Sequence, residues 1–269
     1  MALRPLITGA RPNTGEPPGA PSWSRGYPTN AVPWFEDFFG VTVGTAVADD
    51  CWLQTAIAGT NVIGTLGGST ATGLLNLATG SSSGDGVILD LNGRTTAIAG
   101  SLGALNTLPG PSRFQARINF GTQTNVRAGF ALLATSSATP GCALGTNWVT
   151  DPATTLAGLD AVVFHVDTAV ASGALRCLYT DNSGTADETF TLRAAPVAST
   201  FYKIEGYIDP TADTLTLYLD GVAAATVIDI SGWAGGNVRP SFAIQTAGAA
   251  SRSMQVDYYY QAVGQTARR

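Results

Sequence analysis

Apolar and polar residues alternate with a period of two through most of this chain. In the clearest run, Phe114, Ala116, Ile118 and Phe120 alternate with Arg113, Gln115, Arg117 and Asn119. Such alternation places every second side chain on the same face, which is typical of a half-buried β-strand. We therefore expect strands at residues 87–91, 113–120, 128–132, 162–166, 175–179, 189–193, 201–208, 214–219, 223–228, 242–245 and 254–260.

Turn signals separate these runs. They include Asp85-Gly86, Asn92-Gly93, Asn182-Ser183-Gly184, Asp209-Pro210 and Asp220-Gly221. The five residue types in them, Asp, Asn, Gly, Ser and Pro, all favour tight turns. The one helical turn that we expect covers residues 151–158, with Asp151 as its cap and Pro152 at its first position. Many short strands, each with one buried face, predict an all-β protein built as a two-sheet antiparallel β-sandwich.

The N-terminal segment has a different composition from the rest of the chain. It contains Pro5, Pro12, Pro17, Pro18, Pro21, Pro28 and Pro33. Proline restricts the backbone and donates no hydrogen bond, so this segment should be extended, with polyproline character. We expect an arm over residues 1–33, a sandwich domain over 34–263 and a tail over 264–269. The arm is expected to lie along a neighbouring subunit or on its own sandwich, with Trp23, Tyr27 and Trp34 as its anchors.

The low content of charged residues indicates a surface that partners cover. Charged residues make up 12% of the chain, about half of the usual quarter. Apolar residues make up 45%, which argues against intrinsic disorder. A thinly charged surface favours assembly, so a homo-oligomer is expected.

The net charge excludes one class of partner. A value of −5, with a pI of about 4.7, argues against nucleic-acid binding, which needs a basic stripe. No stretch is long and apolar enough to cross a bilayer. The first residues, MALRPLITGARP, lack the apolar run of a secretory signal. We expect synthesis in the cytoplasm and no membrane partner.

Several segments resemble the concanavalin A-like lectin/glucanase superfamily. They are FYKIEGYID at 201–209, TLTLYLDG at 214–221 and MQVDYYY at 254–260. The opening WFEDFF at 34–39, Gly67-Gly68 and LATG at 77–80, ahead of GDG at 84–86, resemble virion proteins of tailed bacteriophages that carry this sandwich. The resemblance covers about residues 34–263. It implies a concanavalin A-like jelly roll, a fold that hosts lectins, hydrolases and virion modules alike.

The catalytic signature that the resemblance implies for glucanases is missing. That signature is Glu-x-Asp-x-x-Glu, and none of Glu16, Glu36, Glu188 and Glu205 fits it. Along a strand, Glu205 and Asp209 would lie about 13 Å apart, whereas retaining hydrolysis needs about 5–5.5 Å. His165 is the single histidine, and we expect it to be a hydrogen-bonded strand residue. We predict no catalytic residue and no enzyme; an aspartate pair from different strands leaves a glycosidase open.

Metal ligands are sparse. The cysteines, Cys51, Cys142 and Cys177, are widely separated and are expected to be small apolar residues rather than metal ligands. We expect no cofactor. Calcium stays open because Asp181 and Asp187 offer oxygen ligands around Gly184, although a polar hairpin turn explains this segment equally well.

Aromatic residues are the candidates for contact with sugars. Trp52, Trp148 and Trp233 lie in or near glycine-rich loops, where they would either stack on a sugar ring or serve as buried anchors. Strict alternation sends Tyr258 and Tyr260 to one face of their strand and Tyr259 to the other. Core packing is expected to account for two of these three tyrosines.

Taken together, these features predict a non-enzymatic virion structural protein of a tailed bacteriophage. It would be a capsid decoration (cement) protein or a head or tail fibre module, located in the virion, with the major capsid protein or itself as its partner. The alternative is a lectin-like carbohydrate-binding module that recognises host glycans. A glycosidase with an atypical acid pair is a third reading.

Overall fold

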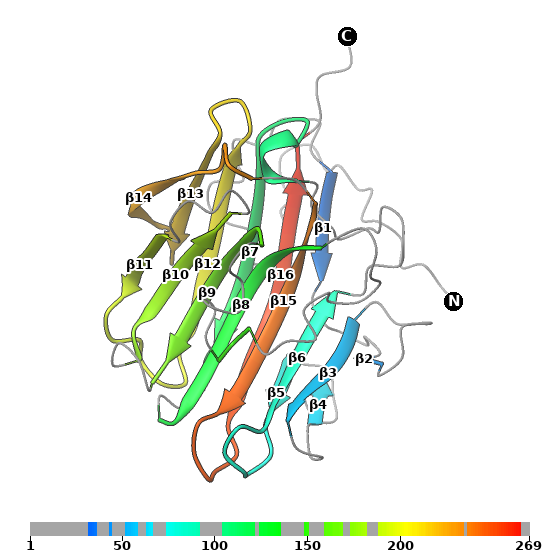
Figure 1. Ribbon diagram of the computed structural model, residues 1–269, viewed down its shortest axis with the longest axis vertical. Helices are drawn as coiled ribbons and strands as arrows, with labels where there is room; N and C mark the ends of the chain where they lie inside the picture. Colours follow the sequence, from blue (N-terminus) through cyan, green and yellow to red (C-terminus); the bar gives the residue numbers. More distant parts are fainter. Residues whose placement is uncertain are drawn as a thin grey trace, which may run out of the picture.

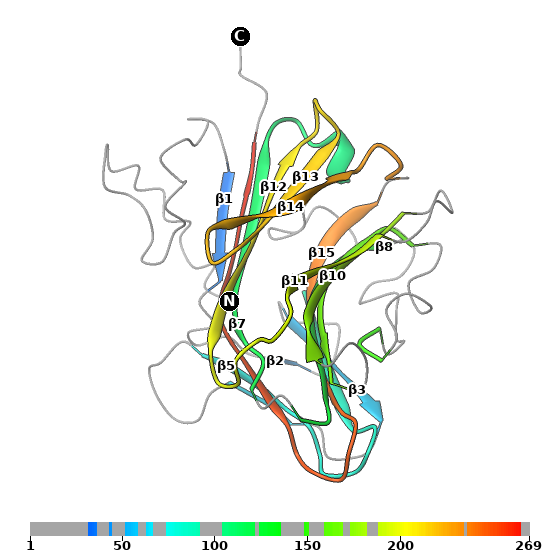
Figure 2. The same cartoon turned by 90° about the vertical axis from the view of Figure 1, so that its left-hand side faces the viewer.

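Two antiparallel β-sheets packed face to face make up the molecule (Figure 1). The computed structural model describes residues 32–36, 43–44, 52–58, 63–66, 74–91, 104–121, 124–135, 148–150, 159–168, 173–181, 188–233 and 236–264. Each sheet has eight strands. Turning the molecule by 90° shows the sheets as two layers with the core between them (Figure 2).

Sheet A contains the strand closest to the C-terminus near its middle. Its spatial order is β14 (Val222–Asp229), β13 (Thr214–Leu219), β12 (Phe201–Asp209), β7 (Ser112–Asn119), β16 (Ser253–Val263), β5 (Leu75–Ala78) and β4 (Ile63–Leu66), and β1 (Val32–Glu36) also pairs with β16. The partners of β1 are residues 259–263, whereas those of β5 are residues 253–256. The two short strands therefore pair with different halves of β16.

Sheet B carries the second half of the core. Its order is β11 (Glu188–Arg193), β10 (Leu175–Thr180), β9 (Ala161–Asp167), β8 (Val126–Thr135), β15 (Asn237–Thr246), β6 (Gly86–Leu91), β3 (Trp52–Ala58) and β2 (Val43–Gly44). A 3₁₀ turn, η2 (Leu105–Thr107), precedes β7. The structure confirms the expected all-β, two-sheet sandwich. In the part of the chain described, no helix has the length and apolar character needed to cross a membrane.

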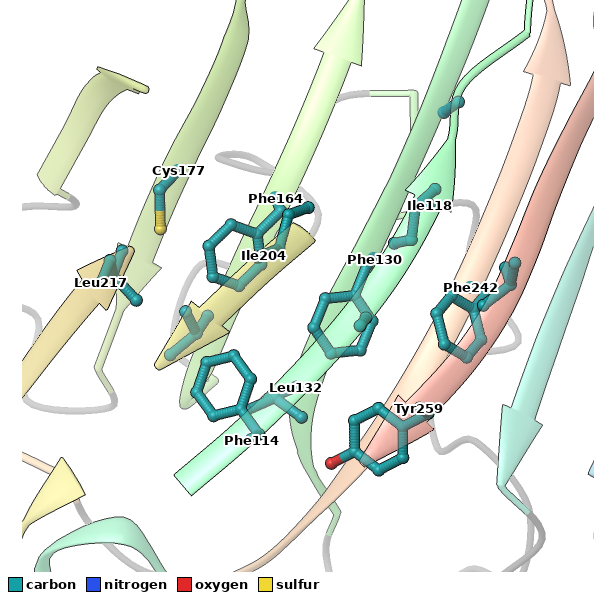
Figure 3. Close-up of a cluster of buried hydrophobic side chains, with 14 of the residues drawn as sticks. Phe114, Ile118, Phe130, Leu132, Phe164, Cys177, Ile204, Leu217, Phe242 and Tyr259 are labelled. Carbon is teal, nitrogen blue, oxygen red and sulfur yellow. The ribbon is translucent and has the colours of Figure 1, made fainter. Parts of the chain in front are cut away.

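Aromatic rings from both sheets interlock at the centre of the core (Figure 3). Phe114 and Tyr259 project from sheet A, and Phe130, Phe164 and Phe242 project from sheet B. The Phe130 ring lies at the centre, 5.1 Å from Phe242, 5.7 Å from Phe164 and 5.8 Å from Tyr259 between ring centroids. Tilted and offset pairs at these distances stabilise a core beyond the area they bury.

One glycine makes room for this cluster. Gly206 of β12 lies opposite Phe114 of β7, and a Cβ atom at Gly206 would come within 2.2 Å of the Phe114 ring. A real side chain never packs so close, so the ring occupies the space that a larger residue would fill.

The strand and turn chemistry predicted for residues 201–228 is confirmed. β13 covers residues 214–219 as expected. The turn that follows is a two-residue hairpin in which Asp220 has φ 51° and Gly221 has φ 81°. Positive φ at both central residues is the geometry that Asp-Gly favours between antiparallel strands. In the preceding turn, the Asp209 Oδ1 atom accepts hydrogen bonds from the Thr211 and Ala212 amides.

The expectation for β16 is wrong at one point. Strict alternation places Met254, Val256, Tyr258 and Tyr260 together, but the register of β16 against β7 shifts between Val256 and Tyr258. Such a bulge inserts one residue and reverses the side-chain faces beyond it. Met254, Val256 and Tyr259 therefore lie in the main core, whereas Tyr258 and Tyr260 form a separate buried cluster with Ala262.

Several strands in the first third of the chain were not expected, namely β1 to β5. β1 extends over residues 32–36 and crosses the expected boundary between arm and sandwich; the division into arm, domain and tail stays a prediction. The expected helical turn at 151–158, the Asn92-Gly93 turn and the Asn182-Ser183-Gly184 turn lie outside the described residues.

Candidate functional site

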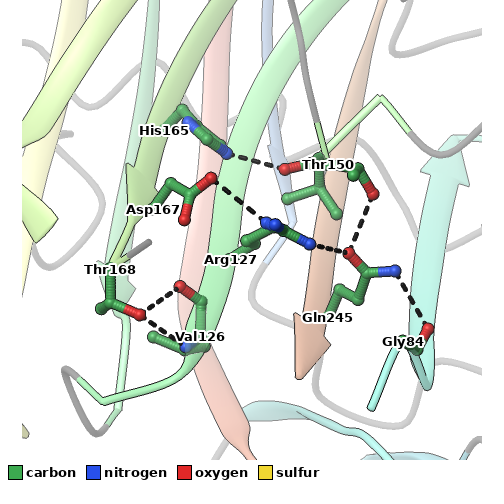
Figure 4. A network of polar contacts seen from close by, with 9 residues as sticks. Gly84, Val126, Arg127, Thr150, His165, Asp167, Thr168 and Gln245 are labelled. Atoms are coloured by element: carbon green, nitrogen blue, oxygen red, sulfur yellow. Dashed lines mark hydrogen bonds and ion pairs between the residues drawn. The ribbon is translucent and has the colours of Figure 1, made fainter. Parts of the chain in front are cut away.

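The outer face of sheet B carries a group of polar side chains at one end. Core residues such as Phe130 and Phe164 point inward, so the residues that alternate with them point away from sheet A. On this outer face lie Arg127 of β8, His165 and Asp167 of β9, and Gln245 of β15, and Figure 4 shows them side by side.

Hydrogen bonds join these side chains into one network (Figure 4). The Arg127 Nε atom donates to Asp167 Oδ2 at 3.2 Å, and its Nη1 atom donates to Gln245 Oε1 at 3.2 Å. The Thr150 hydroxyl donates to the same Gln245 oxygen at 2.8 Å, and Gln245 Nε2 donates to the Gly84 carbonyl at 3.0 Å. The network therefore fixes the side chains of three strands and two loops relative to one another.

Solvent reaches this network through Arg127. Its side chain is 24% exposed, whereas that of Asp167 is 2% exposed. Because Asp167 and the Gln245 amide oxygen both accept hydrogen bonds from Arg127, its guanidinium group is held in a fixed orientation. Its N–H donors therefore point in defined directions.

His165 is a neutral structural residue. Its Nε2 atom lies 2.8 Å from the Val149 carbonyl oxygen; because a carbonyl only accepts, the imidazole carries its proton on Nε2. The pKa of His165 is lowered to about 4, mainly by burial and in smaller part by the charges of Arg176 and Arg127, against the opposing effects of the Val149 hydrogen bond and Asp167. The expectation of a hydrogen-bonded strand histidine is confirmed.

Residues 148–150 cover the middle of this outer face. The Trp148 ring lies directly on Gly129, where a Cβ atom would come within 3.0 Å of it, and the indole Nε1 donates to the Ser241 hydroxyl at 3.2 Å. Beneath these residues lies an apolar cluster that includes Ile88, Ala131, Leu133, Ala161, Val163, Leu178 and Ala243. We call residues 148–150 the strap. It covers the centre of the outer face of sheet B and does not cover the polar end.

The polar end is bounded by two loops, residues 79–85 and 246–252, which we call the loop end. The Gly84 amide donates to Thr246 O at 2.8 Å, and the Thr246 amide donates to Asp85 O at 2.9 Å. The Thr79 hydroxyl accepts from the Arg252 amide at 2.9 Å. These bonds hold the two loops side by side, as the lower end of Figure 1 shows.

Asp85 is the carboxylate of the loop end. Its Oδ2 atom accepts from the Ser82 amide at 3.0 Å, and within the described ranges no donor is found on its other oxygen. The three serines before Gly84 are exposed. The loop end therefore combines a fixed carboxylate with accessible hydroxyl groups.

The three tryptophans proposed to stack on sugars are all buried. Trp52 and Trp148 are 0% exposed and Trp233 is 3% exposed. Trp52 and Trp233 belong to the main core, and Trp148 of the strap packs in the apolar cluster between the strap and sheet B. In this conformation each ring is an anchor, and a role in stacking on sugars stays a prediction.

Other proposed residues lie partly outside the described part. Trp23, Tyr27, Cys51, Cys142 and Asp187 fall outside it. The Trp34 backbone pairs with Gln261, but its side chain is not described. Cys177 is buried, and burial raises the pKa of its thiol far above the ordinary value, which agrees with a small apolar role.

Calcium stays a proposal. Asp181 is buried at the end of β10. Over the described residues, no group of three or more His, Cys, Asp or Glu side chains is placed to hold a metal ion.

The acidic residues weighed for catalysis lie on sheet A. Glu205 is fully buried on the outer face of sheet A, where its Oε1 atom is 2.7 Å from the Lys203 Nζ atom. Asp209 sits in the turn after the same strand and accepts two backbone hydrogen bonds. Both carboxylates therefore have structural roles, on the sheet opposite the polar network.

Comparison with known proteins bears on the fold. No protein-family model and no curated protein matches the chain. Among solved structures, peanut lectin aligns with a TM-score of 0.56 and 10% identity, over 87% of this chain and 97% of the lectin. Lectin II from Ulex europaeus aligns with a TM-score of 0.55 and 12% identity, over 88% and 100%. The fold is that of the concanavalin A-like lectins.

A third lectin domain agrees with this result. The carbohydrate recognition domain of Emp47p aligns with a TM-score of 0.51 and 14% identity, over 87% of this chain and 97% of that domain. The superfamily resemblance drawn from the sequence is confirmed for the fold. Nothing in the comparisons bears on a virion role, which stays a prediction.

The sequence did not point to Arg127, Asp167, Gln245 or Asp85 as a site. Each is an outward or turn residue of an ordinary type, and the network joins residues as far as 161 positions apart. Only the strand order brings them together. The Gly84-Asp85-Gly86 segment was noted as a turn, which is the one signal that falls on the site.

Proposed function

We propose that the chain is a non-enzymatic carbohydrate-binding domain, whose ligand site is the loop end together with the Arg127 network. The observation that supports this most directly is the fixed set of Arg127, Asp167, Gln245 and Asp85 at the polar end of the outer face of sheet B, where Arg127 is partly exposed and the other three are buried. Sugar hydroxyls both donate and accept, so a sugar site needs carboxylate, amide and guanidinium groups held in defined directions.

Pre-organisation is the property that suits these residues for binding. The Gln245 amide is held by Arg127, Thr150 and the Gly84 carbonyl, so it loses little freedom when a ligand arrives. Asp85 is buried, and its oxygen that accepts no hydrogen bond from the described residues is suited to accept one from a sugar hydroxyl. The remaining Arg127 N–H groups are suited to donate. The lectin-type fold is compatible with this role but does not by itself assign it.

Glycan-array screening followed by calorimetry tests this proposal. Asp85→Asn should weaken binding of any glycan found on the array by about tenfold or more, since hydrogen bonds to charged groups contribute about 1.5–3 kcal/mol. Asp209→Asn, in a turn of sheet A, is the matched control and should leave affinity unchanged. Saturable binding that Asp85→Asn does not alter would place the site elsewhere.

A second candidate is the virion structural role, and one surface feature favours assembly. β14 is the edge strand of sheet A among the described strands, and its residues from Val222 to Ile228 include no charged or proline residue. Val222 is 71% exposed and Val227 is 52% exposed. Exposed, uncharged edge strands pair readily with other chains. Light scattering of the wild type beside Val222→Lys/Val227→Lys tests this: an oligomer that the variant reduces to monomer supports assembly through β14.

A further inference from the structure

Arg176 of β10 is a cation that the network leaves unused. It lies on the outer face of sheet B, in register with His165 of β9 and with Thr191 of β11. The residue is half-buried, and its Nε atom is fully buried without a hydrogen-bond acceptor. No described residue forms an ion pair or hydrogen bond with it, whereas Arg127 has Asp167 and Arg117 has Asp257.

A buried guanidinium N–H without an acceptor is unfavourable in the free protein. Leaving such a donor unsatisfied destabilises the folded state, because the group gives up its hydrogen bonds to water without replacement. Native structures rarely keep such groups, and those that persist are often at functional positions. The exposed neighbour Thr191 leaves one side of Arg176 facing solvent.

The local charge is positive in a chain that is negative as a whole. Among the described residues of β8, β9 and β10 at this end of the outer face, the charged side chains are Arg127, Arg176 and Asp167, and His165 is neutral. The Asp85 carboxylate lies beyond them, at the loop end beside β15. Both arginines lower the pKa of His165, so both charges act at this face. The whole chain carries −5, so this excess is local and does not arise from the protein's overall field.

The two arginines are spaced for an oligosaccharide. Strand β9 lies between the strands of the two arginines. Arg176 of β10 is in register with His165 of β9, and Arg127 of β8 is in register with Asp167, two residues further along β9. Standard sheet spacings put their Cα atoms about 10 Å apart across the sheet and about 7 Å apart along it. A ligand that contacts Arg127 and extends across β9 therefore reaches Arg176 with a later sugar unit.

We propose that Arg176 binds the carboxylate of an acidic sugar, such as a uronic acid, so that the ligand class is an acidic rather than a neutral glycan. This inference rests on the proposed function. The planar guanidinium matches a carboxylate in two parallel hydrogen bonds, which is the geometry that arginine provides and lysine does not.

Calorimetry with matched ligands tests this. Uronic-acid oligosaccharides are titrated beside the same oligosaccharides with the carboxyl group reduced to an alcohol, and sulfated oligosaccharides form a third arm. The wild type should prefer the acid form by about tenfold or more, because a charge-assisted hydrogen bond is lost on reduction. Arg176→Gln should remove the preference. The matched control is Arg113→Gln on sheet A, which removes the same charge and should retain the preference.

Each result decides between the two proposals. Equal binding of acid and reduced forms overturns the role of Arg176 and leaves carbohydrate binding intact. Binding of neither form, on a protein that also fails a neutral array, overturns both. Equal loss in Arg113→Gln shows a general charge effect and overturns the role of Arg176. A preference for sulfated over carboxylated ligands overturns the carboxylate assignment.

Folding of the variant is checked by circular dichroism. Arg176→Gln removes an unbonded buried N–H and is expected to fold. If it does not, Arg176→Lys keeps the charge but lacks the paired N–H groups, and should reduce the acid preference several-fold. An unchanged preference in Arg176→Lys would contradict bidentate binding.

Discussion

His165 shows how one residue couples the strap to the strand beneath it. Its neutral imidazole donates to the Val149 carbonyl. Its partner on the neighbouring strand β8 is Gly129, on which the Trp148 ring lies. The neutral state is required because the site is buried, and burial disfavours the charged form. The same residue therefore stabilises the covered face at neutral pH and weakens it in acid.

The pH dependence of stability should report this residue. The pKa of His165 is lowered from 6.5 in the unfolded chain to about 4 in the folded protein. The stability that neutral His165 contributes is fully present above pH 6.5 and is lost as the pH drops from 6.5 to about 4. Below pH 4 the imidazole is protonated in both states, and stability no longer changes through this residue. The free energy of unfolding should lose about 3 kcal/mol across this window. Urea unfolding from pH 7 to 4 measures it.

His165→Gln is the control for this titration. Its amide still donates to the Val149 carbonyl but does not titrate, so the loss of stability between pH 6.5 and 4 should shrink by the histidine contribution. An identical pH profile in both proteins would show that other groups are responsible.

Gly129 offers a test of the strap itself. A Cβ atom at this position would lie 2.7 Å from the Phe164 carbonyl and 3.0 Å from the Trp148 ring. Gly129→Ala should therefore displace Trp148 and destabilise the protein by about 1–3 kcal/mol, which is the usual cost of overpacking. Tryptophan fluorescence should shift to longer wavelength as the indole contacts water. A variant as stable as the wild type, with unchanged fluorescence, would contradict the tight packing of the strap.

At the scale of elements, the hairpin from β12 to β14 could be predicted from sequence because its turns and strands agree. Asp220-Gly221 supplies two positive φ angles and residues 214–219 supply a clean alternation. β6 carried less signal, because its inner face packs in the main core while Ile88 on its outer face lies in the apolar cluster with the strap, and all six of its residues are buried. β5 has four residues, too few to establish a period.

The turn at residue 221 gives a prediction at this scale. Gly221 has φ 81°, and nothing lies within 4 Å of a Cβ atom there, so only backbone strain opposes a side chain. Gly221→Ala should destabilise the protein by about 1–2 kcal/mol, measured by thermal unfolding. Gly206→Ala, which meets the Phe114 ring at 2.2 Å, should destabilise it more. The reverse order would contradict the distinction between strain and overpacking.

At the scale of the molecule, strand order decides which residues share a site. Arg127 and Gln245 are 118 residues apart and become neighbours because β8 and β15 pair. Periodicity identifies which face each residue takes, but the order of strands depends on non-local pairing that no local pattern encodes. The fold class was therefore accessible from the sequence, whereas the network on sheet B was not.

The expected arm also belongs to this scale. If residues 1–33 bind a neighbouring subunit, a chain that begins at residue 34 should remain folded but fail to join particles or oligomers. Circular dichroism and co-sedimentation with assembled particles measure the two properties. Unchanged incorporation of the shortened chain would contradict the arm's role in assembly.

The central claim is that the loop end of sheet B binds carbohydrate, and amide chemical-shift mapping tests it most directly. The protein, labelled with nitrogen-15, is titrated with acidic and neutral oligosaccharides. We predict saturable shifts at Gly84, Asp85, Arg127 and Gln245, extending to Arg176 with acidic ligands, and none on the outer face of sheet A. An absence of saturable shifts with every glycan, or shifts confined to sheet A, would contradict the account.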